Sequence, residues 1–185
     1  MFSYRLRNAP LQVKVMVAGF LLSLSLAYLY ALGNIALVIG LTPKDIAVHY
    51  YGADQKVLEE KSTPGEEESL DLDAADLEQG TEMGPRPSFK NLVQEGHFHL
   101  FGMTSFFFGL TLLGLFTGIQ DKYKVVLVGV PYLTIVFDNL SFMATRFLGP
   151  GFSYLTALAG GFMAISFTAL WLCIGLEILK KPEAL

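Results

Sequence analysis

Four long apolar stretches divide the chain, and segments with charged residues separate them. With histidine counted as neutral, residues 15–43, 96–120 and 147–176 contain no charged side chain, and residues 125–144 contain only Asp138. A helix of about 20 mostly apolar residues spans the hydrocarbon core of a bilayer, which is about 30 Å thick. The pattern therefore predicts four membrane-spanning helices, at about residues 15–40, 96–119, 125–147 and 152–178.

The connections between the second, third and fourth helices are short, which favours antiparallel neighbours. We therefore predict an all-α fold, an integral membrane four-helix bundle that forms a single membrane domain over residues 1–185. The first apolar run is well beyond the 7–15 residues typical of a signal peptide, so we expect it to be a retained helix.

Basic residues mark one side of the predicted bundle. They precede the first helix, separate the second from the third, and follow the fourth; they are Arg5, Arg7, Lys14, Lys122, Lys124, Lys180 and Lys181. Because cytoplasmic segments are enriched in lysine and arginine, we predict that both termini are cytoplasmic.

The long segment at residues 41–95 falls on the opposite side and is strongly acidic. It contains 13 acidic and 5 basic residues, a net charge of −8. Its part at residues 62–87 lacks aromatic residues and is rich in proline and glycine, which predicts a partly disordered extracytoplasmic loop. A negative loop argues against nucleic acid as a partner. The expected partner is the lipid bilayer, and a second membrane or periplasmic protein is a candidate partner of the loop.

One calcium motif in this loop fails. Asp71, Asp73 and Glu82 match positions 1, 3 and 12 of an EF-hand, but Ala75 and Asp76 stand where a ligand and a glycine are required.

Composition agrees with a membrane protein, since 52% of the 185 residues are hydrophobic and only 16% are charged. The single cysteine, Cys173, excludes an intrachain disulfide and a thiolate-cluster metal site.

Polar residues gather on the loop side of the predicted spans. Asp138 is the strongest signal, because an ionisable residue inside a membrane span needs a partner or a proton. His97 and His99 open the second span, and His49 follows the first. The candidate partners of Asp138 are His99, Arg146 and Asn34. The supporting polar residues of this predicted cluster are Asp138, Glu95, Asn34, Asn139, Ser141 and Arg146.

The spacing of His97 and His99 limits what they do together. Two residues correspond to about 200° around an α-helix, so only one of them faces the bundle if this segment is helical. In that case we expect His99 to be the inward one. If the segment is extended, both histidines can face one site.

Three chemistries are compatible with these residues. His99 or His97, with His49 as the opposite ligand, suits haem b. His49, His97 and His99, with Glu95 or Asp138, suit zinc or another divalent metal. Alternatively, Asp138 and a histidine transfer protons or hydrogen-bond a quinone-like headgroup. The structural alternative is that the histidines cap a helix end and Asp138 belongs to a packing pair.

The segments VHYYG (residues 48–52) and HFHLFGM (residues 97–103) resemble those of a group of small, uncharacterised four-helix bacterial inner-membrane proteins. Asp138 and Ser141 are similar to an aspartate and serine in the third helix of that group, whereas Gly96 replaces an expected threonine. The resemblance implies a bacterial inner membrane and a shared site of His49, His97, His99 and Asp138. It implies no reaction.

The sequence thus predicts a polytopic inner-membrane protein, a small redox-associated module that binds haem or a metal ion at its periplasmic face. The alternative is an accessory or assembly subunit of a membrane complex, in which the polar cluster is structural. No serine or cysteine is recognisably paired with a base, so the sequence names no hydrolytic reaction.

Overall fold

The computed structural model describes residues 4–52 and 87–182, and every regular element within these ranges is helical. Four helical segments are long and apolar enough to cross a membrane: Leu11–Ile39, Phe89–Leu115, Asp121–Leu148 and Pro150–Leu179. The predicted all-α class with four spans is confirmed. Residues 53–86, which include most of the predicted acidic loop, lie outside the described residues.

The first span is helix α1 (Leu11–Asn34), continued by the π-helical turn η2 (Ile35–Ile39). It ends at Gly40, whose φ of 91° favours glycine. Only 11% of the most apolar window of this span is buried, compared with 33% for each of the last two spans. Most of the surface of α1 therefore faces away from the other helices.

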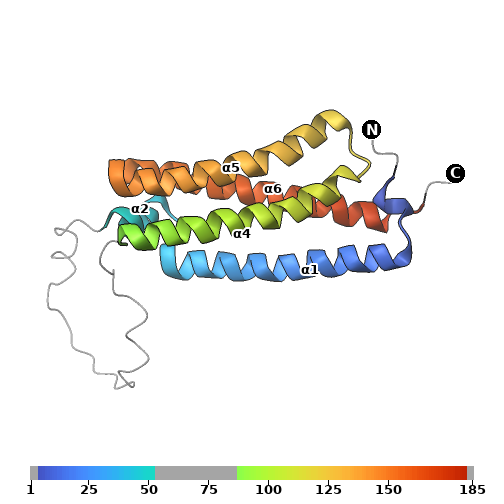
Figure 1. Cartoon of the computed structure of the whole chain (residues 1–185), viewed down its shortest axis with the longest axis horizontal. Helices are drawn as coiled ribbons and strands as arrows, with labels where there is room; N and C mark the ends of the chain where they lie inside the picture. The colour runs from blue at the N-terminus through green and yellow to red at the C-terminus, as the bar shows by residue number, and fades with distance from the viewer. Residues whose placement is uncertain (1–3, 53–86, 183–185) are drawn as a thin grey trace, which may run out of the picture.

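A short helix, α2 (Pro43–Tyr51), follows and lies across one end of the bundle (Figure 1). Thr42 and Asp45 form a capping box at its start, since each side chain bonds the backbone N–H of the other. Ile46 and Tyr50 are buried and pack with Leu92 and Phe142 of the bundle. The predicted loop thus begins with a docked helix.

The remaining spans are α4 (Phe89–Leu115), α5 (Asp121–Leu148) and α6 (Ser153–Leu179). They are sequential antiparallel neighbours, as predicted, and α5 contacts both α4 and α6 extensively. Helix α4 starts seven residues before the predicted position, because Ser88 caps it by accepting a hydrogen bond from the Asn91 N–H. Helix α5 continues through Pro131, as helices in membranes tolerate.

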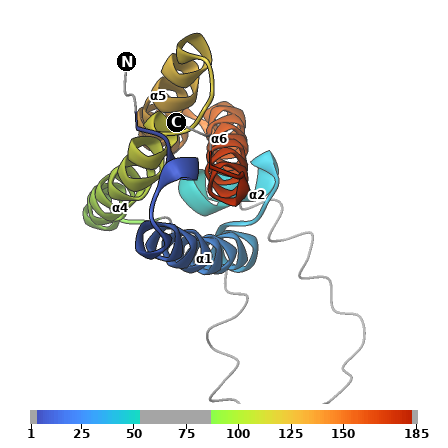
Figure 2. The same cartoon turned by 90° about the vertical axis from the view of Figure 1, so that its right-hand side faces the viewer.

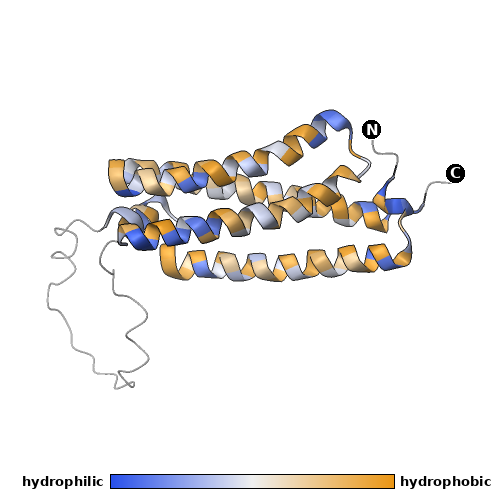
Figure 3. Cartoon of the chain, in the orientation of Figure 1, coloured by the Kyte–Doolittle hydropathy of each residue, from blue (hydrophilic) through white to orange (hydrophobic). Residues whose placement is uncertain are grey.

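The four long helices surround a common core when viewed along the bundle (Figure 2). Its buried centre includes Phe107, Leu110, Ile135, Leu170 and Ile174. We call the end with α2 and the 3₁₀ turn η3 (Pro150–Phe152) the loop end. The terminal end has the turn η1 (Leu6–Asn8) and both chain termini (Figure 1). Hydrophilic residues lie mainly toward these two ends (Figure 3).

Candidate functional site at the loop end

His99 on α4 and Asp138 on α5 form the central pair of the site. The His99 Nε2 and Asp138 Oδ2 atoms lie 2.8 Å apart, and the two side chains are 34% and 10% exposed. This distance is that of an ion pair, but the Nε2 atom is buried and makes no aligned hydrogen bond. Of the three candidate partners of Asp138, the structure therefore places His99 beside it.

Hydroxyl groups brace the backbone of α5 around this pair. The Ser141 Oγ atom lies 2.8 Å from the Asp138 carbonyl oxygen and 2.9 Å from the Thr156 Oγ1 atom of α6. The Thr145 hydroxyl donates to the Ser141 carbonyl oxygen at 2.8 Å. These bonds join α5 to α6 and satisfy backbone carbonyl groups. None of them involves the Asp138 carboxylate, which faces His99.

A second pair joins α2 to α4. The Tyr50 hydroxyl donates to Glu95 Oε1 at 2.7 Å, and the Tyr50 ring stacks on Phe142 at 5.4 Å. Burial raises the pKa of Tyr50, and the negative charges of Glu95 and Asp138 raise this pKa further. Glu95 and His99 are four residues apart and share one face of α4. The two pairs therefore form one cluster, the loop cluster, made of Tyr50, Glu95, His99 and Asp138.

His49 borders this cluster without joining its central pair. Its ring meets the Tyr50 ring edge-on, with the ring centroids 4.7 Å apart. Burial lowers the pKa of His49, and the negative charge of Glu95 opposes this effect. In the described part of the chain, no contact joins His49 to His99.

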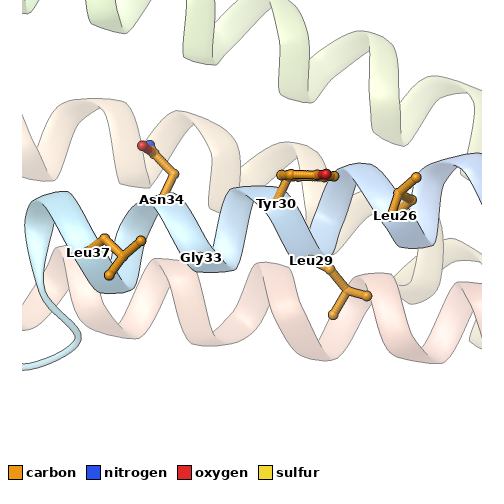
Figure 4. Close-up of a pocket in the computed structure, with 6 residues that line it drawn as sticks. All are labelled: Leu26, Leu29, Tyr30, Gly33, Asn34 and Leu37. Carbon is orange, nitrogen blue, oxygen red and sulfur yellow. The ribbon is translucent and has the colours of Figure 1, made fainter.

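His97 and Asn34 lie away from the cluster. His97 is exposed on another face of α4, where its ring stacks on Phe101 at 6.4 Å. This is the arrangement that the 200° spacing predicts when residues 97–99 are helical. Asn34 is exposed on α1 and lines a shallow depression there (Figure 4). The other residues that line the depression are Leu26, Leu29, Tyr30, Gly33 and Leu37.

Asn139 and Arg146 occupy two other positions on α5. The Asn139 amide donates to the Ile135 carbonyl oxygen at 3.3 Å, and its Oδ1 atom would lie 3.1 Å from a Cβ atom at position 96. Gly96 therefore allows α4 to approach α5 closely. The Arg146 guanidinium lies 5.9 Å from the centre of the Phe147 ring, and its buried Nε atom has no hydrogen-bond partner.

The histidines do not assemble a larger ligand set. Across residues 4–52 and 87–182, no group of three or more His, Cys, Asp and Glu residues is arranged to hold a metal ion. A metal at His99 would thus take at most a pair of ligands from this part of the chain. Haem and metal binding stay predictions.

The sequence-based interpretation missed Tyr50 as a site residue and also missed a buried acid at the terminal end. Glu177 of α6 is 1% exposed; it accepts hydrogen bonds from Arg7 Nε at 2.8 Å and from Lys180 Nζ at 3.1 Å. The Gly118 N–H also bonds to its side chain. A lone acid at the end of an apolar run, three residues before a lysine, was the available signal.

Comparison with known proteins gives one match. A family model described as a transmembrane helical domain matches residues 40–185, which include α2 and the whole loop cluster. The chain belongs to this family. Comparisons with curated proteins and with solved structures give no match. This membership supports the predicted resemblance to a membrane protein family. That the segments VHYYG and HFHLFGM are characteristic of the family stays a prediction.

Proposed function

We propose that this chain is a small redox-associated module of a bacterial inner membrane, with the loop cluster near the periplasmic face. The basic residues at the terminal end support this orientation, because lysine and arginine are enriched on the cytoplasmic side of membrane proteins. The observation on which the proposal rests is the His99–Asp138 pair, 2.8 Å apart inside a membrane helix bundle. An ionisable pair at such a place is a functional hypothesis by default.

The chemistry that suits the pair is proton exchange with a bound carrier. Histidine is a common proton shuttle in proteins, and its ring nitrogens donate and accept hydrogen bonds. Nε2 lacks an aligned acceptor, so rotation of the ring would let it hydrogen-bond a ligand oxygen. The ligand class that we propose is a quinone-like headgroup, whose oxygens accept hydrogen bonds and exchange protons.

Metal binding at the same pair is the second candidate. His99 Nε2 and Asp138 Oδ2 offer one nitrogen and one oxygen ligand side by side. Zinc takes such nitrogen and oxygen ligands, but it usually takes three or four protein ligands at structural and catalytic sites. Haem b at His99 has less support, because His97 points elsewhere and no described histidine contacts His99.

The test measures binding of a short-chain quinone to the detergent-purified protein, with quenching of the Trp171 fluorescence as the signal of binding. His99→Ala and Asp138→Asn should each weaken binding by about tenfold or more, since a hydrogen bond to a charged group is worth about 1.5–3 kcal/mol. His97→Ala is the matched control on the same helix and should leave the dissociation constant unchanged. Equal binding by all four proteins would contradict the proposal.

An absorbance spectrum and a metal analysis of the same samples separate the other candidates. A Soret band lost in His99→Ala would establish haem, and stoichiometric zinc lost in Asp138→Asn would establish the metal site. A colourless, metal-free protein that binds no quinone would favour the accessory-subunit role, with the loop cluster as a structural feature.

A further inference from the structure

Arg146 is a charged residue of the bundle that the proposed function does not use. It lies in the last turn of α5 at the loop end, and its Nε atom is buried without a hydrogen-bond acceptor. The centre of the Phe147 ring lies 5.9 Å from the guanidinium carbon. Within the described residues, no acidic side chain forms an ion pair with Arg146.

The described acids at the loop end are already engaged. Asp138 lies against His99, Glu95 accepts the Tyr50 hydroxyl, and Asp45 belongs to the capping box of α2. A guanidinium that is partly desolvated at a membrane boundary is costly until an anion or hydrogen-bond acceptor meets it. The acceptor for Arg146 is therefore expected from outside the described chain.

The surroundings of Arg146 are suited to lipid. Phe89, Phe147 and Leu148 are 65%, 57% and 72% exposed, and the rings of Phe89 and Phe147 contact each other edge-on. Exposed aromatic and aliphatic groups beside an arginine at the end of a membrane helix are typical of the interface between headgroups and acyl chains. A planar guanidinium presents paired N–H donors that match two oxygens of one phosphate group.

We infer that Arg146 binds the phosphodiester of a phospholipid in the leaflet at the loop end, with the acyl chains against Phe89, Phe147 and Leu148. The phosphodiester oxygens accept hydrogen bonds from the terminal N–H groups of the guanidinium, since only the Nε atom is buried, and the negative charge of the lipid neutralises the guanidinium. The proposal is independent of any ligand at His99, because it concerns another residue and another class of molecule.

The experiment is native mass spectrometry of the full chain in detergent, with phosphatidylglycerol and with diacylglycerol as the matched lipid without phosphate. The wild type should retain phosphatidylglycerol, and Arg146→Gln should reduce the bound fraction by about tenfold, as expected for loss of a charge-assisted bidentate contact. Arg146→Lys should show an intermediate loss. Lys90→Gln, which removes another exposed charge at the loop end, is the control and should match the wild type.

Three results would overturn the inference: equal retention of the two lipids by the wild type, unchanged retention by Arg146→Gln, or an equal loss in Lys90→Gln. Displacement by millimolar inorganic phosphate would assign the site to a free anion instead of a lipid. If Arg146→Gln does not fold, the wild type still provides a test. Its thermal unfolding should be shifted upward by phosphatidylglycerol and not by diacylglycerol.

Discussion

The two ends of the bundle both contain buried charged groups, but they differ in how completely those groups are satisfied. At the terminal end, Arg7, Gly118, Glu177 and Lys180 form what we call the terminal cluster, in which the Glu177 carboxylate accepts bonds from all three other residues. In the loop cluster, the buried His99 Nε2 atom lies near Asp138 but makes no aligned hydrogen bond.

This difference indicates different roles for the two clusters. A polar network in which every member is satisfied makes a structure rigid, and removal of one member is costly. A buried polar atom without a partner is unusual in a folded protein and is often explained by a ligand or a catalytic role. We therefore expect substitutions in the terminal cluster to affect stability most, and substitutions in the loop cluster to affect binding most.

Glu177→Gln should have the largest effect on stability. The change removes the negative charge that faces the partly buried Arg7 guanidinium, and removal of one partner of a buried pair costs about 3–5 kcal/mol. We expect a loss near the lower limit, because Lys180 is 53% exposed. Titration of the purified protein with SDS measures the change. Glu95→Gln is the matched variant in the loop cluster, and an equal loss there would remove the distinction between the ends.

Gly118→Ala should have the next largest effect. A Cβ atom at this position would overlap the Arg7 guanidinium and lie 3.4 Å from Glu177 Oε1, so the guanidinium has to move. Because the obstacle is the end of a flexible side chain, we expect a loss of about 1–2 kcal/mol, within the usual range for single substitutions. Gly96→Ala at the loop end would meet Asn139 Oδ1 at 3.1 Å and should cost less. A reversed order in the SDS titration would show that the loop end is the more rigidly packed.

Tyr50→Phe should loosen α2 without unfolding the bundle. The variant loses the 2.7 Å bond to Glu95 but keeps the ring stacked on Phe142. A single hydrogen bond contributes about 0.5–1.5 kcal/mol, so amide exchange in α2 should accelerate by about threefold to tenfold. Tyr154→Phe, at a tyrosine that is 62% exposed, should leave this exchange unchanged. Acceleration throughout α4 and α5 would mean that α2 stabilises the whole bundle.

The smallest effect should be a dependence of α2 docking on pH. Burial places the pKa of His49 in the docked state below its ordinary value of 6.5, with Glu95 opposing the shift and Tyr50 adjacent. Undocked α2 therefore binds more protons, so docking is stable above pH 6.5 and weakens as the pH falls below that value. Amide exchange at pH 7 and pH 5, corrected for the intrinsic rates, should show a small loss of protection. His49→Gln should abolish this loss, and an unchanged dependence in that variant would exclude His49 as its cause.

The fold was predictable because membrane spans have a strong one-dimensional signal. Four runs of apolar residues were enough to identify the four long helices. In lipid, the backbone N–H and C=O groups of a span have to hydrogen-bond within that span, which favours a helix. The predicted second span began at about residue 96 because the preceding Lys90, Asn91, Gln94 and Glu95 are polar. They belong to α4, which buries Leu92, exposes Lys90, Asn91 and Gln94, and turns Glu95 toward Tyr50.

The site was predictable only where helix periodicity applies. The spacing of His97 and His99 implies that only one of them faces the bundle if the segment is helical, and Asp138 was marked by its isolation in an apolar run. The Tyr50–Glu95 bond joins residues 45 positions apart across the acidic segment, and Arg7 and Glu177 are 170 apart. Periodicity within one helix cannot show which residues of different helices meet, so these contacts required the three-dimensional structure.

The contact between Arg7 and Glu177 has a consequence for how the protein is made. Synthesis proceeds from the N-terminus, so Arg7 reaches the membrane long before its partner on α6 has been translated. Until α6 arrives, Arg7 in the turn η1, just before the sparsely packed helix α1, cannot contact Glu177. Assembly is therefore completed by the last helix, which brings the Glu177 carboxylate to Arg7.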